Sequence, residues 1–263
     1  MNLGLAGSAA VVVGGARGLG RAIAAAFAEE GCRVGVWDVS PDVHATAAEL
    51  GGDGWQVDVA DDAAVRTAAG ETWAKFGAVD HVAFAVGIGS GKFGFPFWQL
   101  DPGDWARVLR VNLVGAASVA HAFAPKLAER KTGTMLFLSS VAGQNGSQTD
   151  PPYSASKAGL INFAQCAAKD LAPFGVRVNC LCPGMVKTPL NRSVWQAWWD
   201  RQPPDARQEY DAWAAEKITK LVPLNRWQTP EDIAAMAVFL ASDRAANVTG
   251  QTVNVDGGYV MRG

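Results

Sequence analysis

The stretch Ala9-Ala-Val-Val-Val-Gly-Gly-Ala-Arg-Gly-Leu-Gly20 decides the fold. Its first five residues are apolar and rich in β-branched side chains, which predicts a short buried strand over 9–13. After the glycines, Ile23, Ala26 and Phe27 recur at helical spacing. Strand, glycine turn and helix in this order predict a phosphate-binding turn, because glycine lets the backbone approach closely and a helix N-terminus offers free N–H groups.

An acidic residue ends the next strand, which is predicted over 33–38. Asp38 follows the glycine turn by about twenty residues, where a carboxylate can accept hydrogen bonds from an adenosine ribose and repel a 2′-phosphate. Residue 39 is valine rather than a compensating arginine, so NAD is the predicted cofactor. The alternative is that Asp38 caps a helix beginning near Pro41.

Strands and helices then alternate along the whole chain. Further strands are predicted at 55–59, 81–87, 134–139, 176–182 and 251–255, with helices at 61–76, 104–129, 153–172 and from Pro230. Such alternation predicts an α/β fold, a doubly wound parallel seven-stranded sheet of Rossmann type with ligands at the carboxyl ends of the strands. At 263 residues and 49% hydrophobic composition, we expect a single domain over 1–263.

The net charge and the cysteine content argue against several classes of function. A formal net charge of -2 and the absence of a basic run argue against nucleic acid or an anionic membrane as partner. Four cysteines without a Cys-x-x-Cys framework predict buried, reduced thiols in a cytoplasmic protein. The three histidines stand in unrelated segments, so no metal site is expected.

A hydroxyl, a phenol and an ammonium share one short window, Ser140, Tyr153 and Lys157. If a helix starts near 153, Tyr153 and Lys157 lie one turn apart on the same face. We expect the ammonium to favour the phenolate and so lower the pKa of Tyr153. This arrangement predicts proton exchange with an alcohol or carbonyl oxygen that Ser140 also holds.

Taken together, these motifs resemble the short-chain dehydrogenase/reductase family, nearly end to end. The segment Gly14-Gly-Ala-Arg17-Gly18-Leu19-Gly20 is similar to the family's phosphate turn, and Asp58-Val59 to its adenine-contacting pair. The matches to the catalytic tetrad are Asn112, Ser140, Tyr153 and Lys157. The remaining cofactor contacts implied are Gly87 and, in the segment that meets the nicotinamide carboxamide, Pro183, Gly184, Val186 and Thr188.

The resemblance implies an NAD-dependent oxidoreductase for a secondary alcohol or ketone. Tyr153 would exchange the proton, Lys157 would hold the nicotinamide ribose, and Asn112 would anchor a water of the proton relay. Arg17 opposes the NAD prediction, because a basic residue there often serves NADP-binding relatives. Two alternatives stay open, a 3-oxoacyl-carrier-protein-type ketoreductase and a non-catalytic dinucleotide-binding regulator. The family also implies a homotetramer, with Phe123, Leu127, Phe163 and Ala167 as candidate contacts or core residues.

The sequence departs from the family at two strand ends. Val13 replaces a frequent threonine, and Phe84-Ala85-Val86-Gly87 replaces the usual Asn-Asn-Ala-Gly. Because both polar groups are lost together, we expect apolar packing to join the two strand ends. A cofactor contact from Ala85 is therefore in doubt.

The segment 189–229, named the lid here, is expected to close over the substrate as it does in the family. Trp195, Trp198 and Trp199 share one helical face, which either lines the substrate pocket or packs structurally, on the body of the protein or on another subunit. The first option predicts a mostly apolar, cyclic or aromatic secondary alcohol or ketone, facing Phe93, Phe95, Phe97 and Trp98. The competing hypothesis is an anionic substrate bound by Arg192 or Arg201.

Overall fold

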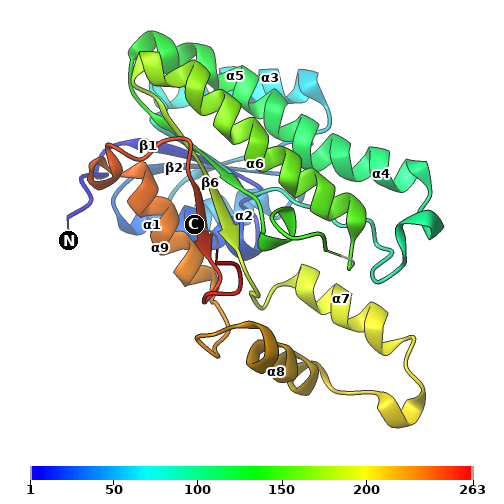
Figure 1. The fold of residues 1–263 in the computed structure, drawn as a ribbon. Helices are drawn as coiled ribbons and strands as arrows, with labels where there is room; N and C mark the ends of the chain where they lie inside the picture. The colour runs from blue at the N-terminus through cyan, green and yellow to red at the C-terminus, as the bar shows by residue number, and fades with distance from the viewer. Residues whose placement is uncertain (1, 148, 262–263) are drawn as a thin grey trace.

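One parallel sheet forms the centre of the protein in the computed structural model, which describes residues 2–147 and 149–261 (Figure 1). The strand order is β3-β2-β1-β4-β5-β6-β7, and every neighbouring pair is parallel. The strands are β1 (Ala9–Val13), β2 (Arg33–Asp38), β3 (Asp53–Gln56), β4 (His81–Phe84), β5 (Thr134–Leu138), β6 (Arg177–Pro183) and β7 (Thr252–Val255). The order reverses between β1 and β4, which creates a ligand crevice at their carboxyl ends. The predicted doubly wound parallel sheet is confirmed.

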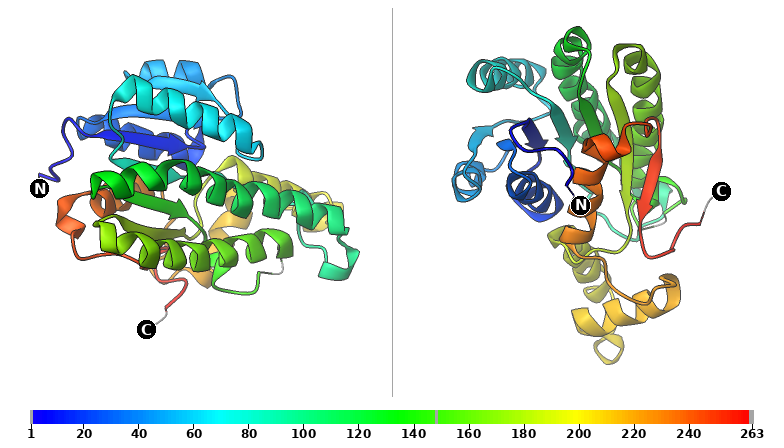
Figure 2. Two further views of the ribbon diagram at one scale, coloured as in Figure 1. Left: turned by 90° about the horizontal axis from the view of Figure 1, so that it is seen from above. Right: turned by 90° about the vertical axis from the view of Figure 1, so that its left-hand side faces the viewer.

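Helices cover both faces of this sheet (Figures 1 and 2). One face carries α3 (Asp62–Phe76), α4 (Pro102–Leu109), α5 (Gly115–Arg130) and α6 (Pro151–Leu171). The other carries α1 (Gly18–Glu29), α2 (Val43–Glu49) and α9 (Pro230–Ala241). All five residues of β1 are consequently buried, which explains their unbroken apolar character.

The third and fourth strands differ most from the prediction, whereas the later strands differ by one residue at one or both ends. The third strand spans 53–56 rather than 55–59, because only these residues pair with β2. Val57 and Val59 are apolar because they reach the core beside α3, not because they belong to the sheet. The fourth strand ends at Phe84 rather than at 87, where the chain turns away after Ala85 N donates to Val13 O at 2.7 Å.

The run predicted as one helix over 104–129 consists of α4, a π-helical turn at Arg110–Val114, and α5. By length and composition alone this run could cross a membrane, but its buried side chains pack on the sheet as those of a core helix do. Phe123 and Leu127 are fully buried there, so they are core residues and not oligomer contacts. Phe163 and Ala167 of α6 are partly buried against the same core.

The cysteines only partly follow the prediction. Cys180 and Cys182 are buried on one face of β6, whereas Cys32 is half-buried and Cys166 is exposed on α6. All four are free thiols. Cys166 is exposed because it lies on the solvent side of its amphipathic helix.

The lid contains α7 (Pro189–Trp199) and α8 (Tyr210–Leu221), which extend beyond the carboxyl ends of the strands (Figure 1). The tryptophans of α7 pack inside the lid itself. Trp195 lies against Tyr210 with ring centroids 5.7 Å apart, and Trp198 lies 6.2 Å from Trp213. Trp199 packs beside Trp195 and beneath the Arg207 guanidinium. Structural packing, the second of the two options, is therefore the role of these three rings.

A buried histidine at the start of β4 predicts how stability depends on pH. His81 is stacked on Phe27, its Nδ1 lies 2.9 Å from Thr134 Oγ1, and burial lowers its pKa to about 4. Between about pH 6.5 and 4 the unfolded chain binds a proton that the folded chain excludes. The free energy of unfolding therefore falls as pH falls, by about 2 kcal/mol between pH 7 and 5.

Urea unfolding of the wild type and His81→Gln at pH 7 and pH 5 measures this effect. In His81→Gln the difference between the two pH values should shrink by that amount. His44→Gln, which changes an exposed histidine of α2, is the control and should behave as the wild type. Equal pH dependence in the wild type and His81→Gln would contradict the assignment.

Candidate active site

The turn between β1 and α1 depends on glycine for steric reasons. A Cβ at Gly20 would lie 2.0 Å from Gly14 O, and Gly14 itself has a φ of +83°. Helix α1 begins at Gly18, and its N-cap residue Arg17 makes no side-chain capping hydrogen bond. The first amide groups of α1 are therefore available to an anionic ligand such as a pyrophosphate.

A cleft of about 430 Å³ lies over this turn at the crevice between β1 and β4. The predicted cofactor residues that line it are Gly14, Arg17, Gly18, Leu19, Gly20, Asp38, Asp58, Val59, Gly87, Tyr153, Lys157 and Thr188. Ala85, whose contact was in doubt, also borders the cleft, whereas Pro183, Gly184 and Val186 line the neighbouring cavity. This lining fits a dinucleotide. The free amides of α1 and the glycine turn can approach its phosphates, and the Asp38 carboxylate, about twenty residues after the turn, can bind a ribose.

Asp38 holds the turn in place and faces the cleft. Its Oδ2 accepts from Ala16 N and its Oδ1 from Ser40 N, both at 3.0 Å. Each carboxylate oxygen has a second lone pair, so the group retains acceptor capacity for ribose hydroxyls. Asp38 does not cap α2, whose N-cap residue is Asp42, so the capping alternative is wrong.

Apolar packing joins the ends of β1 and β4, as expected from the two departures. Val13 and Phe84 are buried in the same core cluster, and the backbone bond from Ala85 N to Val13 O fastens the two strand ends. No buried polar side chain is needed at this point, so the loss of both polar groups costs the structure nothing there.

Ser140, Tyr153 and Lys157 meet where the cleft adjoins a second cavity. Ser140 follows β5, and its side chain is hydrogen-bonded to Tyr153 of α6. Lys157 is 2% exposed and lies one turn further along α6, with Nζ 5.6 Å from the centroid of the Tyr153 ring. Tyr153 borders both cavities, so its phenol can reach reacting groups from either side.

The pKa values differ from the expectation. Burial raises the pKa of Tyr153 to about 12, an effect larger than the lowering by its bond with Ser140. Burial also lowers the pKa of Lys157 to about 8. The Lys157 Nζ donates to Leu138 O at 2.7 Å and Val86 O at 3.2 Å, and the net shift of the Tyr153 pKa is upward. The predicted lowering of the Tyr153 pKa by Lys157 is therefore wrong for this state.

Asn112 lies in the π-helical turn and is fully buried. Its Oδ1 accepts from Ile88 N at 2.8 Å, and its Nδ2 donates to Ile88 O and Ser156 Oγ, both at 2.9 Å. Asn112 thus fixes the chain leaving β4 against α6. These bonds occupy the side chain, so it serves first to hold the loop beneath the site.

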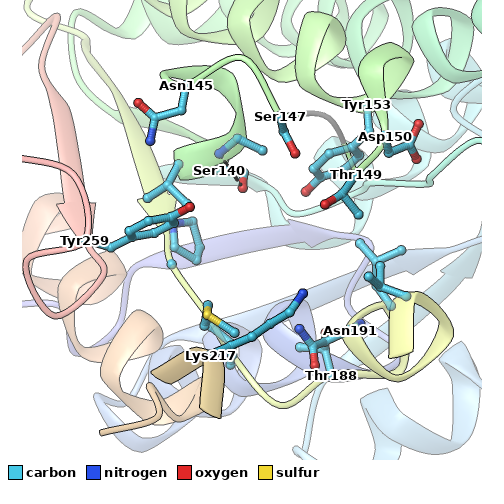
Figure 3. Close-up of a pocket in the computed structure, with 18 of the residues that line it drawn as sticks. Ser140, Asn145, Ser147, Thr149, Asp150, Tyr153, Thr188, Asn191, Lys217 and Tyr259 are labelled. Carbon is cyan, nitrogen blue, oxygen red and sulfur yellow. Dashed lines mark hydrogen bonds between the residues drawn. The ribbon is translucent and has the colours of Figure 1, made fainter. Parts of the chain in front are cut away.

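The second cavity, of about 460 Å³, lies between Tyr153 and the lid (Figure 3). Sequence reasoning missed several of its polar lining residues, namely Asn145, Ser147, Thr149, Asp150, Asn191, Lys217 and Tyr259. Trp213 is the tryptophan among the lining residues, and Phe93 the phenylalanine. Phe97 and Trp98 instead lie on the surface, 62% and 71% exposed. No periodicity in the sequence marks the missed positions, because they come from four separate segments, namely the loop before α6, α7, α8 and the segment after β7.

Asp150 is the carboxyl group among the residues that line the substrate cavity. It is 4% exposed, its Oδ2 accepts from Ser90 N at 2.8 Å, and burial raises its pKa. Its charge is close enough to raise the pKa of Tyr153. The sequence Asp150-Pro-Pro-Tyr153 could have indicated that Asp150 lies near Tyr153, because an acidic residue directly before a helix lies at its first turn.

The two arginines proposed as anion ligands lie elsewhere. The Arg192 guanidinium stacks over the ring of Tyr210 at 5.1 Å, and that of Arg201 stacks over Phe95 at 5.0 Å. Neither borders the substrate cavity. In residues 2–147 and 149–261, no three His, Cys, Asp or Glu side chains lie close enough together to hold a metal ion.

Comparison with known proteins agrees with this geometry. The family model described as enoyl-(acyl carrier protein) reductase matches residues 14–260. D-threitol dehydrogenase from Mycolicibacterium smegmatis is 34% identical, over 98% of this chain and 95% of its own. A 3-oxoacyl-(acyl-carrier-protein) reductase from Chlamydia muridarum is 31% identical, over 98% of this chain and 99% of its own.

A solved structure of ribose-5-phosphate isomerase from Brucella melitensis has the same fold, with a TM-score of 0.85 and 31% identity over 97% of this chain and 92% of that one. Proteins with the same fold can catalyse different reactions, so this similarity supports the fold and does not indicate the activity. The glycine turn, the helix-borne tyrosine and lysine, and the match over residues 14–260 show that the chain belongs to the short-chain dehydrogenase/reductase family.

Proposed function

We propose that this protein is an NAD-dependent oxidoreductase that transfers a hydride between the nicotinamide and a secondary alcohol or ketone. The observation that carries the proposal is the position of Tyr153. Its phenol lies on the wall shared by a glycine-lined cleft and a separate cavity, beside Ser140 and Lys157. A proton donor at the junction of two ligand sites suits hydride transfer from one ligand to the other.

In ketone reduction, Tyr153 donates a proton to the carbonyl oxygen while Ser140 donates a hydrogen bond to the same oxygen. A pKa of about 12 keeps the phenol protonated at neutral pH, which suits the acid role. Lys157 is buried between β4 and β5, facing the cleft, where it would hold the ribose of the nicotinamide half. The nicotinamide would supply the hydride and, when oxidised, a positive charge that favours phenolate.

We further propose that the body of the substrate is mostly apolar, cyclic or aromatic. This proposal rests on the apolar wall of the cavity, which is formed by Phe93, Val141, Val194, Trp213 and Leu221. The three tryptophans of α7 do not support it, because they pack within the lid. Removing apolar area from water on this wall contributes about 25 cal/mol per Å². We also propose a cytoplasmic homotetramer, which the family resemblance favours.

An acyl-carrier-protein ketoreductase is the second candidate, favoured by the description of the matching family model and by the relative from Chlamydia muridarum. Asp38 argues against it, because such ketoreductases usually use NADP and a carboxylate at that position repels the 2′-phosphate. A non-catalytic regulator is disfavoured by the complete set of Asn112, Ser140, Tyr153 and Lys157.

Tyr153→Phe should remove the proton-transfer group without disturbing the cleft. We expect kcat to fall about 10²–10⁴-fold, because general acid–base groups contribute that much. NADH affinity, measured by fluorescence titration, should be nearly unchanged. A variant that keeps most of its kcat with the best alcohol from a panel of cyclic and aromatic secondary alcohols would refute the mechanism.

Cofactor preference should depend on Asp38. The wild type should show a higher kcat/KM with NAD than with NADP, and Asp38→Ala should narrow this gap because the repelling carboxylate is lost. Asp42→Ala is the matched control, since Asp42 is an exposed acid of the same loop outside the cleft. The assignment fails if NADP is preferred by the wild type or if the two variants behave alike.

The charge of Asp150 should tune the pH dependence of the reaction. Since that charge raises the pKa of Tyr153, Asp150→Asn should lower it. Alcohol oxidation requires the phenolate, so its pH–rate profile should shift to lower pH in Asp150→Asn. Asp170→Asn changes an exposed acid near the other end of α6 and should leave the profile in place. An unshifted profile in Asp150→Asn would show that the two groups are not coupled.

A further inference from the structure

Lys217 of α8 directs its ammonium group into the substrate cavity. Figure 3 shows the side chain reaching from the lid towards the cavity, on the side opposite Ser140 and Tyr153. The side chain is half-buried, and its Nζ lies 4.1 Å from the centroid of the Trp213 ring. A cation–π contact occupies one side of an ammonium and leaves hydrogen atoms for a ligand.

This ammonium has no ion-pair partner or hydrogen-bond acceptor among residues 2–147 and 149–261. Two other lysines of this region are paired, Lys187 with Asp211 at 2.8 Å and Lys220 with Glu216 at 2.5 Å. Burial accordingly lowers the pKa of Lys217. A partly desolvated cation without a partner is unfavourable, and an anion bound beside it would recover that free energy.

A second hydrogen-bond donor lies on the same side of the cavity. Asn191 of α7 lines the cavity, and its Oδ1 accepts from Tyr210 Oη at 2.8 Å. That bond orients the side-chain amide and leaves its NH₂ group for a ligand. Lys217 and Asn191 therefore present an ammonium and an amide donor together, which is the chemistry that binds a carboxylate.

The opposite wall of the cavity carries a carboxyl group, that of Asp150. Asp150 lies beside Tyr153, and no lysine or arginine other than Lys217 is among the lining residues. A carboxylate on the substrate would be repelled from Asp150 and attracted to the lid. The charges thus orient an anionic substrate with its reacting carbon towards Ser140 and Tyr153.

We propose that Lys217 and Asn191 bind a carboxylate group of the substrate, so that the substrate is a hydroxy or oxo acid with an apolar body. This inference rests on the proposed oxidoreductase function for the identity of the reacting group. The anion site itself is testable without turnover, so the two can fail separately.

Calorimetric titration with cyclohexanecarboxylate and its neutral analogue cyclohexanecarboxamide, in the presence of NADH and separately of NADPH, tests the site. The wild type should bind the carboxylate more tightly than the amide. Lys217→Met should weaken carboxylate binding by about tenfold to a hundredfold and weaken amide binding much less. Lys217→Arg, which keeps the charge, should retain the preference.

Lys220→Met is the matched control, because it removes the same charge from α8 at an exposed position outside the cavity. It should bind both probes as the wild type does. Thermal unfolding of each variant verifies that the lid remains folded. Equal affinity of the wild type for the two probes, or a loss in Lys217→Met no greater than in Lys220→Met, would overturn the proposal.

The kinetic counterpart compares oxidation of 3-hydroxycyclohexanecarboxylate with that of cyclohexanol. Lys217→Met should raise KM for the acid by about tenfold to a hundredfold with little change in kcat, since the ammonium lies away from the reacting carbon. The KM for cyclohexanol, which has no carboxylate, should change much less than the KM for the acid. A wild type that prefers cyclohexanol to the acid would contradict the assigned substrate class even if the probe carboxylate binds.

Discussion

The active site depends on one buried cation. The Lys157 ammonium lies among the ends of β4, β5 and α6, where it donates to Leu138 O and Val86 O. A buried charge is tolerated only when it is hydrogen-bonded, so these carbonyls must stay in place and the three elements must keep their relative positions. Gly87 allows this approach, because a Cβ there would lie 3.2 Å from Lys157 Nζ. The cleft and the substrate cavity therefore meet at a fixed point.

Two further contacts extend that fixed region. Asn112, in its π-helical turn, clamps the loop after β4 through Ile88, and Asp150 holds the same loop through Ser90 N. Both residues lie next to α6, on which Tyr153 is carried. The loop, the helix and the strand ends are thus connected by hydrogen bonds to buried polar groups. These bonds stabilise the structure much less if any partner moves.

The lid contrasts with this rigid base. Its aromatic side chains form a cluster of their own, centred on Tyr210 and Trp213, so the lid is stabilised mainly from within. Its residues Arg192, Arg201 and Arg207 stack on aromatic rings of the lid and of the loop that carries Phe95. What the lid offers to the cavity is a limited set of side chains, among them Val194, Asn191 and Lys217. Under the proposed function, substrate selection therefore rests on these few lid positions, whereas Ser140, Tyr153 and Lys157 lie outside the lid.

The sequence by itself determined the fold class, the family and the residues that surround the cleft. It could do so because a parallel strand, a glycine turn and a helix obey local rules of backbone sterics and hydrophobic period. Gly20 illustrates this, since any side chain there would collide with Gly14 O. The boundaries of β3 and β4 were less well predicted, because buried valines beyond a strand look like valines within it.

Only the tertiary structure decided the properties that depend on distant neighbours. Burial, which no local pattern encodes, raised the pKa of Tyr153, whereas the sequence predicted a lower pKa because of Lys157. The same holds for the lid, where Trp195, Trp198 and Trp199 share a helical face that could have met either the cavity or α8. Asp150 and Lys217, sixty-seven residues apart in the sequence, became opposite walls of one cavity because the chain folds back over the ends of its own strands.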